Sequence, residues 1–232
     1  MPARTALLLG ATGLVGGHLL RRLAADGRWG RVFTLDRRPV APAGPTHEGH
    51  VVDFDRLGAE ADDPAGGPGR FACDDLFCAL GTTMARAGSR EAFRRVDLEI
   101  PFEAAQLAHS AGATQMLLVS SLGADPDART FYTRTKGEAE RAVAQVGFEA
   151  VQTFRPSLLA GDRDETRWGE RLGLAVLSPL VPVLRGPLAA LRPTAADDVA
   201  AAMVEVAAAR PAGAHVYGPD AIRAWARRGS GE

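Results

Sequence analysis

The feature that most constrains the fold of this chain is a glycine-rich turn close to the N-terminus. The apolar residues 5–9 run into Gly10, and glycine recurs at Gly13 and Gly16 before apolar residues at helical spacing over residues 15–25. In such a strand-to-helix turn, the first glycine permits the tight bend, the second lets the backbone approach a pyrophosphate and the third lets helix and strand pack closely. The turn predicts a dinucleotide site whose contacts include Gly10, Thr12, Gly13, Leu14, Val15 and Gly16.

Downstream, short apolar runs alternate with longer segments of helical period. This alternation is typical of repeated strand-helix units around a parallel sheet. We therefore expect an α/β protein with a doubly wound, mostly parallel Rossmann sheet flanked by helices. Further strands are expected at residues 31–36, 51–53, 76–80, 115–119 and 150–154, and helices over 91–111, 131–146 and 195–209.

The length of 232 residues is within the range of one α/β domain, so residues 1–232 are expected to form a single domain. Residues from about 157 to 232 should contribute a lobe that covers the edge of the sheet. Within it, residues 161–193 are expected to form a substrate pocket with apolar walls from Trp168, Leu172, Leu177 and Leu184. The polar tail at 227–232 is expected to fray.

Charge and cysteine content limit the partners. The 27 basic and 28 acidic residues are intermixed, so no nucleic-acid or membrane binding is expected, and a small molecule is the favoured partner. Cys73 and Cys78 lack a second Cys/His pair, which predicts buried reduced thiols and no metal. The chain opens without a long apolar segment, and we expect a cytoplasmic location.

The end of the second expected strand reads Asp36-Arg37-Arg38, where the adenosine ribose would lie. An acidic side chain there accepts hydrogen bonds from the ribose hydroxyls of NAD, whereas an arginine just beyond pairs with the 2′-phosphate of NADP. The paired arginines favour NADP(H), with NAD(H) as the alternative. Asp53, after the third strand, is either a contact to the adenine edge or a simple cap.

A candidate catalytic pair follows the fifth expected strand. Tyr132 and Lys136 are four residues apart in a helical stretch and so share one face. An ammonium beside a phenol favours the phenolate, which allows the tyrosine to act as a general acid or base on a carbonyl or alcohol. Ser121, at the end of the preceding strand, could hold the substrate oxygen.

With these motifs in place, the sequence resembles the short-chain dehydrogenase/reductase superfamily, in its atypical and extended branch. The resemblance rests on residues 10–16, 78–83, 119–125 and 154–156 and on the Tyr132/Lys136 pair. More narrowly, residues 80–83, 93–97, 120–125 and 132–138 are similar to the group that contains the human Tat-interacting oxidoreductase-like protein and its bacterial relatives.

The resemblance implies NADP(H) along the carboxyl edge of the sheet, with Tyr132 as proton donor or acceptor, Lys136 on the nicotinamide ribose and Ser121 orienting the reacting oxygen. Asp97 stands where many superfamily members place an asparagine that supports a proton relay, a departure from the pattern. The further cofactor contacts that it implies are Leu80, Gly81, Thr82, Thr83, Ser120, Pro156, Ser157 and Leu158.

Three functions remain open at this point. The first is an NADP-dependent oxidoreductase that acts on a small carbonyl or alcohol, and the intact Ser121, Tyr132 and Lys136 favour it. The second is a regulatory protein that senses NADPH without turnover. The third is an epimerase or dehydratase with tightly held NAD. A homodimer fits any of them, since helices of this superfamily often pair.

Overall fold

The computed structural model describes residues 3–59, 61, 69–160 and 192–229 and shows a seven-stranded sheet. Its strands lie in the order β3-β2-β1-β4-β5-β6-β9, and every neighbouring pair is parallel. The chain order reverses between β1 and β4, the position where doubly wound sheets form a ligand crevice. The strands are β1 (Arg4–Leu9), β2 (Trp29–Asp36), β3 (His47–Val51), β4 (Asp75–Cys78), β5 (Gln115–Val119), β6 (Ala150–Phe154) and β9 (Gly213–Tyr217).

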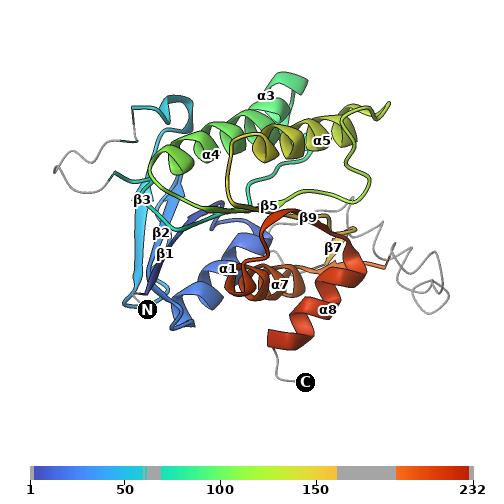
Figure 1. Cartoon of the computed structure of the whole chain (residues 1–232). Helices are drawn as coiled ribbons and strands as arrows, with labels where there is room; N and C mark the ends of the chain where they lie inside the picture. The colour runs from blue at the N-terminus through green and yellow to red at the C-terminus, as the bar shows by residue number, and fades with distance from the viewer. Residues whose placement is uncertain (1–2, 60, 62–68, 161–191, 230–232) are drawn as a thin grey trace.

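Helices cover both faces of this sheet (Figure 1). On one face lie α1 (Leu14–Ala25), α7 (Ala196–Ala209) and α8 (Pro219–Gly229), and on the other lie α3 (Arg90–Arg94), α4 (Ile100–Ser110) and α5 (Phe131–Ala144). Each face has its own apolar core against the central strands. The expected doubly wound α/β fold is therefore confirmed. Smaller elements are η1 (Phe54–Arg56), α2 (Met84–Ala87), the π-helical turn η2 (Arg95–Glu99), and the short pair β7 (Leu159–Ala160) and β8 (Thr194–Ala195).

The helix expected over residues 91–111 is interrupted by η2, and Pro101 accounts for the interruption. Proline has no amide hydrogen, so Pro101 cannot donate to the carbonyl of Asp97, four residues earlier. The chain widens into a π-turn there and resumes as α4 with Pro101 in its first turn. Asp97 is 2% exposed within that turn, so the interruption brings a carboxylate into the interior.

Three expectations were wrong, two about the edge strands of the sheet and one about the C-terminal tail. The third strand lies at His47–Val51 rather than 51–53, because its polar residues form an exposed edge strand without an apolar signature. In the last third, β9 extends the sheet instead of only covering it, and four of its five residues are exposed. The tail is helical through Gly229, where Arg227 and Arg228 lie in the last turn of α8.

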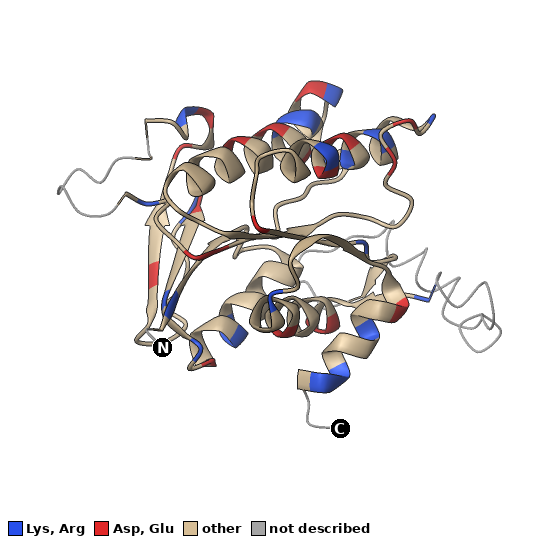
Figure 2. Cartoon of the chain, viewed as in Figure 1, with Lys and Arg blue, Asp and Glu red and all other residues tan. Residues whose placement is uncertain are grey.

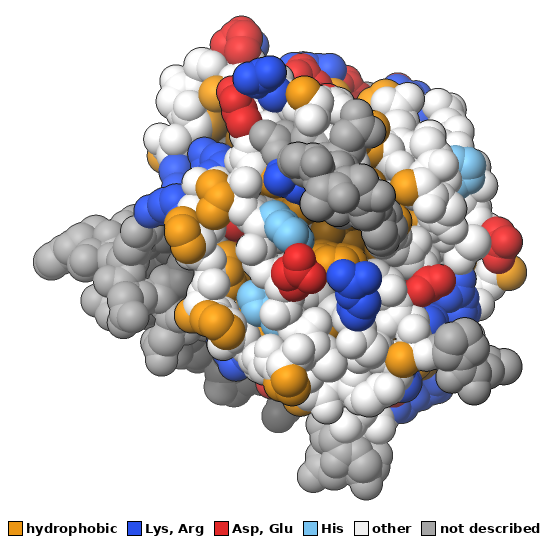
Figure 3. Space-filling model, turned by 90° about the vertical axis from the view of Figure 1, so that its left-hand side faces the viewer, with side chains coloured by type: hydrophobic (Ala, Val, Ile, Leu, Met, Phe, Trp, Pro, Cys, Tyr) orange, Lys and Arg blue, Asp and Glu red, His pale blue; other side chains and the backbone are white. Residues whose placement is uncertain are grey.

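The surface carries charge of both signs on every helix layer (Figure 2). On the side of the molecule that contains β3, basic, acidic, histidine and hydrophobic side chains are interspersed (Figure 3). In the described part of the chain, no helix is both long and apolar enough to span a membrane, and no cluster of His, Cys, Asp or Glu could hold a metal ion. Cys73 and Cys78 are both free and buried.

Candidate active site

The glycine turn has the steric features that its sequence predicts. Gly10 has a φ of +90°, and a Cβ there would lie 2.8 Å from the backbone of Ala79. A Cβ on Gly16 would lie 1.9 Å from the Gly10 carbonyl oxygen. Side chains at these two positions would push β1, β4 and α1 apart, so both glycines are required by packing.

The N-terminus of α1 is open to an anion. Gly13 is the N-cap residue, makes no side-chain cap, and is followed by a first turn without an acidic residue. Amides in a first helical turn have no acceptor within the helix, and the helix dipole favours negative charge there. Thr12 is exposed, Leu14 is half-buried and Val15 is buried, so Val15 can contact a ligand only through its backbone. This cradle fits a pyrophosphate.

At the end of β2, Asp36 and the two arginines differ in exposure. Asp36 is 3% exposed and its Oδ2 has no hydrogen-bond partner, whereas Arg37 and Arg38 are exposed. Burial raises the pKa of Asp36, against the opposing effect of hydrogen bonding from the backbone of Thr12. The Asp36 carboxylate therefore faces the glycine turn, and the arginines extend beyond it.

Asp53 has a local structural role. It is exposed, and its Oδ1 accepts a hydrogen bond from the Asp55 amide at 2.9 Å, which caps η1. Of the two roles that the sequence left open, the structure shows the cap.

The segment after β4 connects the glycine turn to the candidate catalytic pair, Tyr132 and Lys136. Gly10 packs against Ala79 and Leu80, and a Cβ on Gly81 would lie 3.8 Å from Lys136 Nζ. Thr83 caps α2, with its hydroxyl accepting from the Arg86 amide at 3.3 Å. Residues 79–81 therefore lie between the pyrophosphate cradle and the lysine, as a dinucleotide spanning the two would require.

Lys136 forms a buried ion pair. Its Nζ lies 2.6 Å from Asp97 Oδ1, and Asp97 Oδ2 accepts a hydrogen bond from the Thr82 amide at 2.9 Å. Burial acts to lower the pKa of Lys136, but the Asp97 carboxylate, together with Tyr132 and Cys78, outweighs it, so the pKa lies above its usual value. The lysine is thus held as an ammonium against Gly81. The sequence singled out Asp97 only as a departure from a family pattern and gave no sign of this contact.

Tyr132 lies one helical turn before Lys136, half-buried, with its ring 5.5 Å from that of Phe93. Ser120, at the end of β5, is buried and its hydroxyl has no hydrogen-bond partner. The Ser121 hydroxyl is turned to the Leu122 carbonyl oxygen at 3.4 Å rather than to Tyr132. Tyr132 and Lys136 are therefore one turn apart on α5, and the Ser121 hydroxyl is directed to a neighbouring backbone carbonyl.

Of the residues after β6, Pro156 and Ser157 form hydrogen bonds within the protein and Leu158 is exposed. The Pro156 carbonyl accepts from the Leu122 amide at 2.9 Å, which ties this segment to the one that carries Ser121. The Ser157 hydroxyl donates to the Arg192 carbonyl at 2.5 Å, and Leu158 is 41% exposed. The expected pocket at 161–193, with Trp168, Leu172, Leu177 and Leu184, lies almost wholly outside the described residues.

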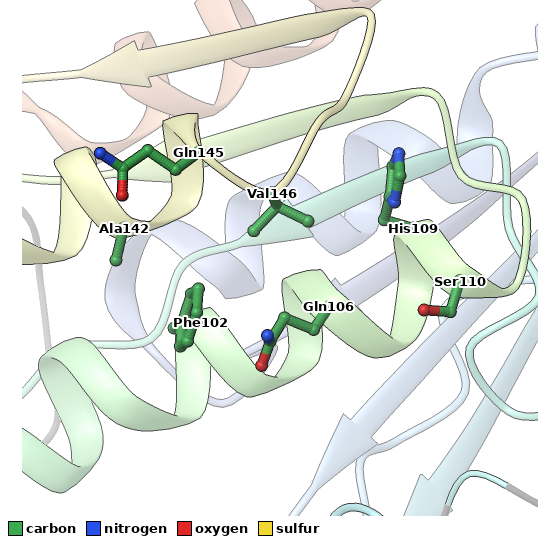
Figure 4. A pocket seen from close by; sticks show the side chains of 7 residues that line it. All are labelled: Phe102, Gln106, His109, Ser110, Ala142, Gln145 and Val146. Atoms are coloured by element: carbon green, nitrogen blue, oxygen red, sulfur yellow. The ribbon is translucent and has the colours of Figure 1, made fainter.

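A surface hollow of about 430 Å³ lies elsewhere, between α4 and the C-terminal end of α5 (Figure 4). Phe102 and Gln106 line it from α4, Ala142 from α5 and Gln145 from the C-cap of α5. Ala142 is ten residues along α5 from Tyr132, or about 15 Å at 1.5 Å per residue. The hollow is therefore separate from the candidate catalytic pair.

Comparison with known proteins identifies the family. The sequence model described as "NAD dependent epimerase/dehydratase family" matches residues 6–218. The mitochondrial protein fmp52 of Emericella nidulans is 36% identical over 168 residues, covering 70% of each chain. Protein HTATIP2 of Rattus norvegicus is 34% identical over 175 residues, covering 74% of this chain and 69% of the rat protein. The resemblance read from the sequence motifs is therefore confirmed.

Solved structures share the fold at lower identity. MoeE5 in complex with UDP-glucuronic acid and NAD has a TM-score of 0.67 and 21% identity, covering 93% of this chain and 76% of that one. Human epimerase family protein SDR39U1 with NADPH has a TM-score of 0.58 and 20% identity, covering 92% and 72%.

The names of the relatives contradict the expected cytoplasmic location. Fmp52 proteins of Emericella nidulans and Aspergillus niger, 36% and 33% identical to this chain, are both named as mitochondrial. The expectation failed because buried thiols indicate a reducing environment and do not distinguish one compartment from another. Fold, motifs and relatives agree on one assignment: the chain belongs to the NAD-dependent epimerase/dehydratase family, an NAD(P)-binding branch of the extended short-chain dehydrogenase/reductase superfamily.

Proposed function

We propose that this protein is an oxidoreductase that binds NADP(H) along the carboxyl edge of its sheet and acts on a small carbonyl or alcohol. The observation that carries the proposal is the placement of the buried Lys136 ammonium. It lies one helical turn from Tyr132 and against Gly81, at the end of a continuous line of contacts from the glycine turn. A bound nicotinamide would supply the hydride.

The chain's own residues would handle the proton. In the reducing direction the Tyr132 hydroxyl donates its proton to the substrate oxygen, and in the oxidising direction it accepts one. Lys136 holds positive charge beside the phenol and has donors that can reach a ribose hydroxyl. Ser121, once its hydroxyl rotates away from Leu122, would fix the position of the substrate oxygen.

The decisive experiment compares wild-type protein with Tyr132→Phe, using NADPH and a panel of small aldehydes and ketones. We expect turnover to fall by at least about 100-fold, because the phenol is the proton donor, while NADPH binding by fluorescence stays unchanged. Turnover that persists in Tyr132→Phe would contradict the assigned role. Binding without turnover in the wild type would favour the NADPH sensor.

The preference for NADP(H) is supported by the arginines after β2. In the described part of the chain, neither Arg37 nor Arg38 makes an ion pair, so both are available to a 2′-phosphate. We expect Arg37→Ala to weaken NADPH binding about tenfold more than NADH binding, by loss of one charge-assisted contact. Arg31→Ala is the control, because Arg31 is also exposed on β2 but pairs with Glu48. Equal losses for both cofactors would remove the preference.

The family match favours a second candidate, an epimerase or dehydratase that keeps NAD bound. MoeE5 was solved with NAD and nucleotide sugars, which makes a nucleotide sugar the substrate to test. Such an enzyme would release NAD on denaturation after purification and would consume no external NADPH. A protein that purifies free of nucleotide would exclude this candidate.

A further inference from the structure

The ion pair between Lys136 and Asp97 alters the charge beside Tyr132. At 2.6 Å the ammonium and the carboxylate are in direct contact, with side-chain exposures of 8% and 0%. The Thr82 amide donates to the other carboxylate oxygen, Oδ2, at 2.9 Å, and Asp97 itself lies within the π-turn. Each oxygen of the carboxylate therefore has a positively polarised neighbour inside the protein, which holds the carboxylate against the lysine.

The pair carries no net charge, its titratable neighbour on β4 is neutral, and a cluster on the partly exposed side of α5 carries one net positive charge. Cys78, from β4, interacts with both Lys136 and Asp97, but burial raises the pKa of its thiol to about 11, so it is neutral. Arg94 of α3 and Arg134 of α5 share Glu138 in ion pairs on the partly exposed side of α5. Within the described residues, Asp97 is the carboxylate that pairs with the catalytic lysine.

An isolated ammonium favours the phenolate form of a nearby tyrosine, which suits the removal of a proton from an alcohol. An ammonium paired with a carboxylate acts instead as a dipole, whose effect at the distance of the next helical turn is much weaker.

We propose that Asp97 is a positioning residue that offsets the charge of Lys136 and keeps Tyr132 protonated, so that the site is set to donate a proton to a carbonyl rather than to take one from an alcohol. This inference rests on the proposed function. In the step, the substrate carbon gains the hydride from reduced nicotinamide cofactor, which is oxidised, and the substrate oxygen gains the proton from Tyr132. The product is the alcohol.

The test reads the tyrosine directly and needs neither cofactor nor substrate. The chain has 2 tyrosines, so subtracting the alkaline absorbance titration of Tyr132→Phe from that of the parent leaves the tyrosinate signal of Tyr132 alone. We expect Asp97→Asn to move the midpoint of this signal to lower pH by about one unit, because Lys136 then acts without its counter-charge. A midpoint that is unchanged or higher would overturn the proposal.

Two further variants keep the test decisive. Glu103→Gln removes a carboxylate that pairs with Arg95, in the helix after the π-turn, and should leave the midpoint in place. If Asp97→Asn does not fold, the double variant Asp97→Asn/Lys136→Met, which removes both charges, decides the matter. The proposal expects its midpoint to equal that of the wild type, and a rise of one unit would contradict it.

Once a substrate is known, the pH dependence of carbonyl reduction gives an independent test. The alkaline limb of carbonyl reduction should move to lower pH in Asp97→Asn, because a smaller fraction of Tyr132 carries the proton that it donates. The absorbance titration stands even if no turnover is found, so failure of this inference and failure of the proposed function are distinguishable.

Discussion

Each end of the central sheet buries an aspartate, but the two carboxylates differ in whether their oxygens have partners. At the amino end, Asp75 of β4 is fully buried and has a partner on every side. Arg4 Nη1 lies 3.2 Å away, Arg210 Nη1 3.1 Å and the indole nitrogen of Trp29 2.8 Å. Its partners come from β1, from the C-cap of α7 and from the start of β2, so this cluster joins elements far apart in the sequence.

At the carboxyl end, buried polar atoms are left without hydrogen bonds. Asp36 Oδ2, Ser120 Oγ and Thr135 Oγ1 have none, and the first turn of α1 lacks a side-chain cap. Buried polar groups in folded proteins are normally paired, so these exceptions mark positions that a water, an ion or a ligand can satisfy. One end of the sheet therefore holds the fold together, while the other has buried polar atoms and helix amides without a protein partner.

The largest effect that sharpens this contrast is expected for Asp75→Asn. Removing this charge leaves Arg4 and Arg210 without their buried partner, and breaking such a cluster costs about 3 kcal/mol in the free energy of unfolding. Urea denaturation measures the loss, and Asp220→Asn, at a largely exposed ion pair on α8, is the control. A loss under about 1 kcal/mol would contradict the stabilising role of this cluster. Weaker NADPH binding by the folded variant would contradict its separation from the cofactor site.

At the carboxyl end of the sheet, Gly13→Asp should have the opposite effect, with little change in stability and a large loss of NADPH affinity. Aspartate is a good N-cap residue, but its Cβ would lie 3.1 Å from the Gly10 carbonyl oxygen, so the free energy of unfolding should fall by no more than about 1 kcal/mol. Its charge would face the pyrophosphate, and NADPH affinity should fall at least about tenfold in a fluorescence titration. Gly17→Ala tests a helical glycine whose added Cβ would have ordinary contacts, and its affinity should stay the same. Unaltered binding by Gly13→Asp would place the anion elsewhere.

The smallest effect is expected for Asp197→Asn, which removes an exposed ion pair at the start of α7. The hydrogen bond from Arg22 lowers the pKa of Asp197 below its unfolded value, so the pair stabilises the protein above about pH 4 and this contribution is lost as the pH falls. Because Asp197 is 50% exposed, we expect less than about 1 kcal/mol at pH 7. Thermal melts should show a difference between variant and wild type that disappears near pH 3; a constant difference would assign the effect to packing.

The sequence predicts the parts of this molecule that local rules determine. The glycine turn, the strands at 115–119 and 150–154 and the Tyr132/Lys136 helix follow from spacing and apolar period, and the structure has them. The two strands are buried in the centre of the sheet and the helix packs on one of its faces, where pattern and packing agree.

What the sequence did not predict depends on contacts between distant residues. The strand β3 and the strand β9 are exposed edges whose side chains carry no apolar period. The contact between Asp97 and Lys136 joins residues 39 positions apart, and Asp97 lies in the π-turn that precedes Pro101. Only the folded arrangement shows which carboxylate meets which ammonium.

The π-turn also determines which face of α4 points to the sheet. A π-turn spends one residue more than an α-turn, so every side chain after it is rotated by about 100° relative to an uninterrupted helix. The inward stripe of α4, which includes Ile100, Ala104 and Ala108, is in phase with the sheet only after that rotation. One missing amide hydrogen thus aligns the covering helix, so that a deletion within 95–99 would turn this stripe away from the sheet.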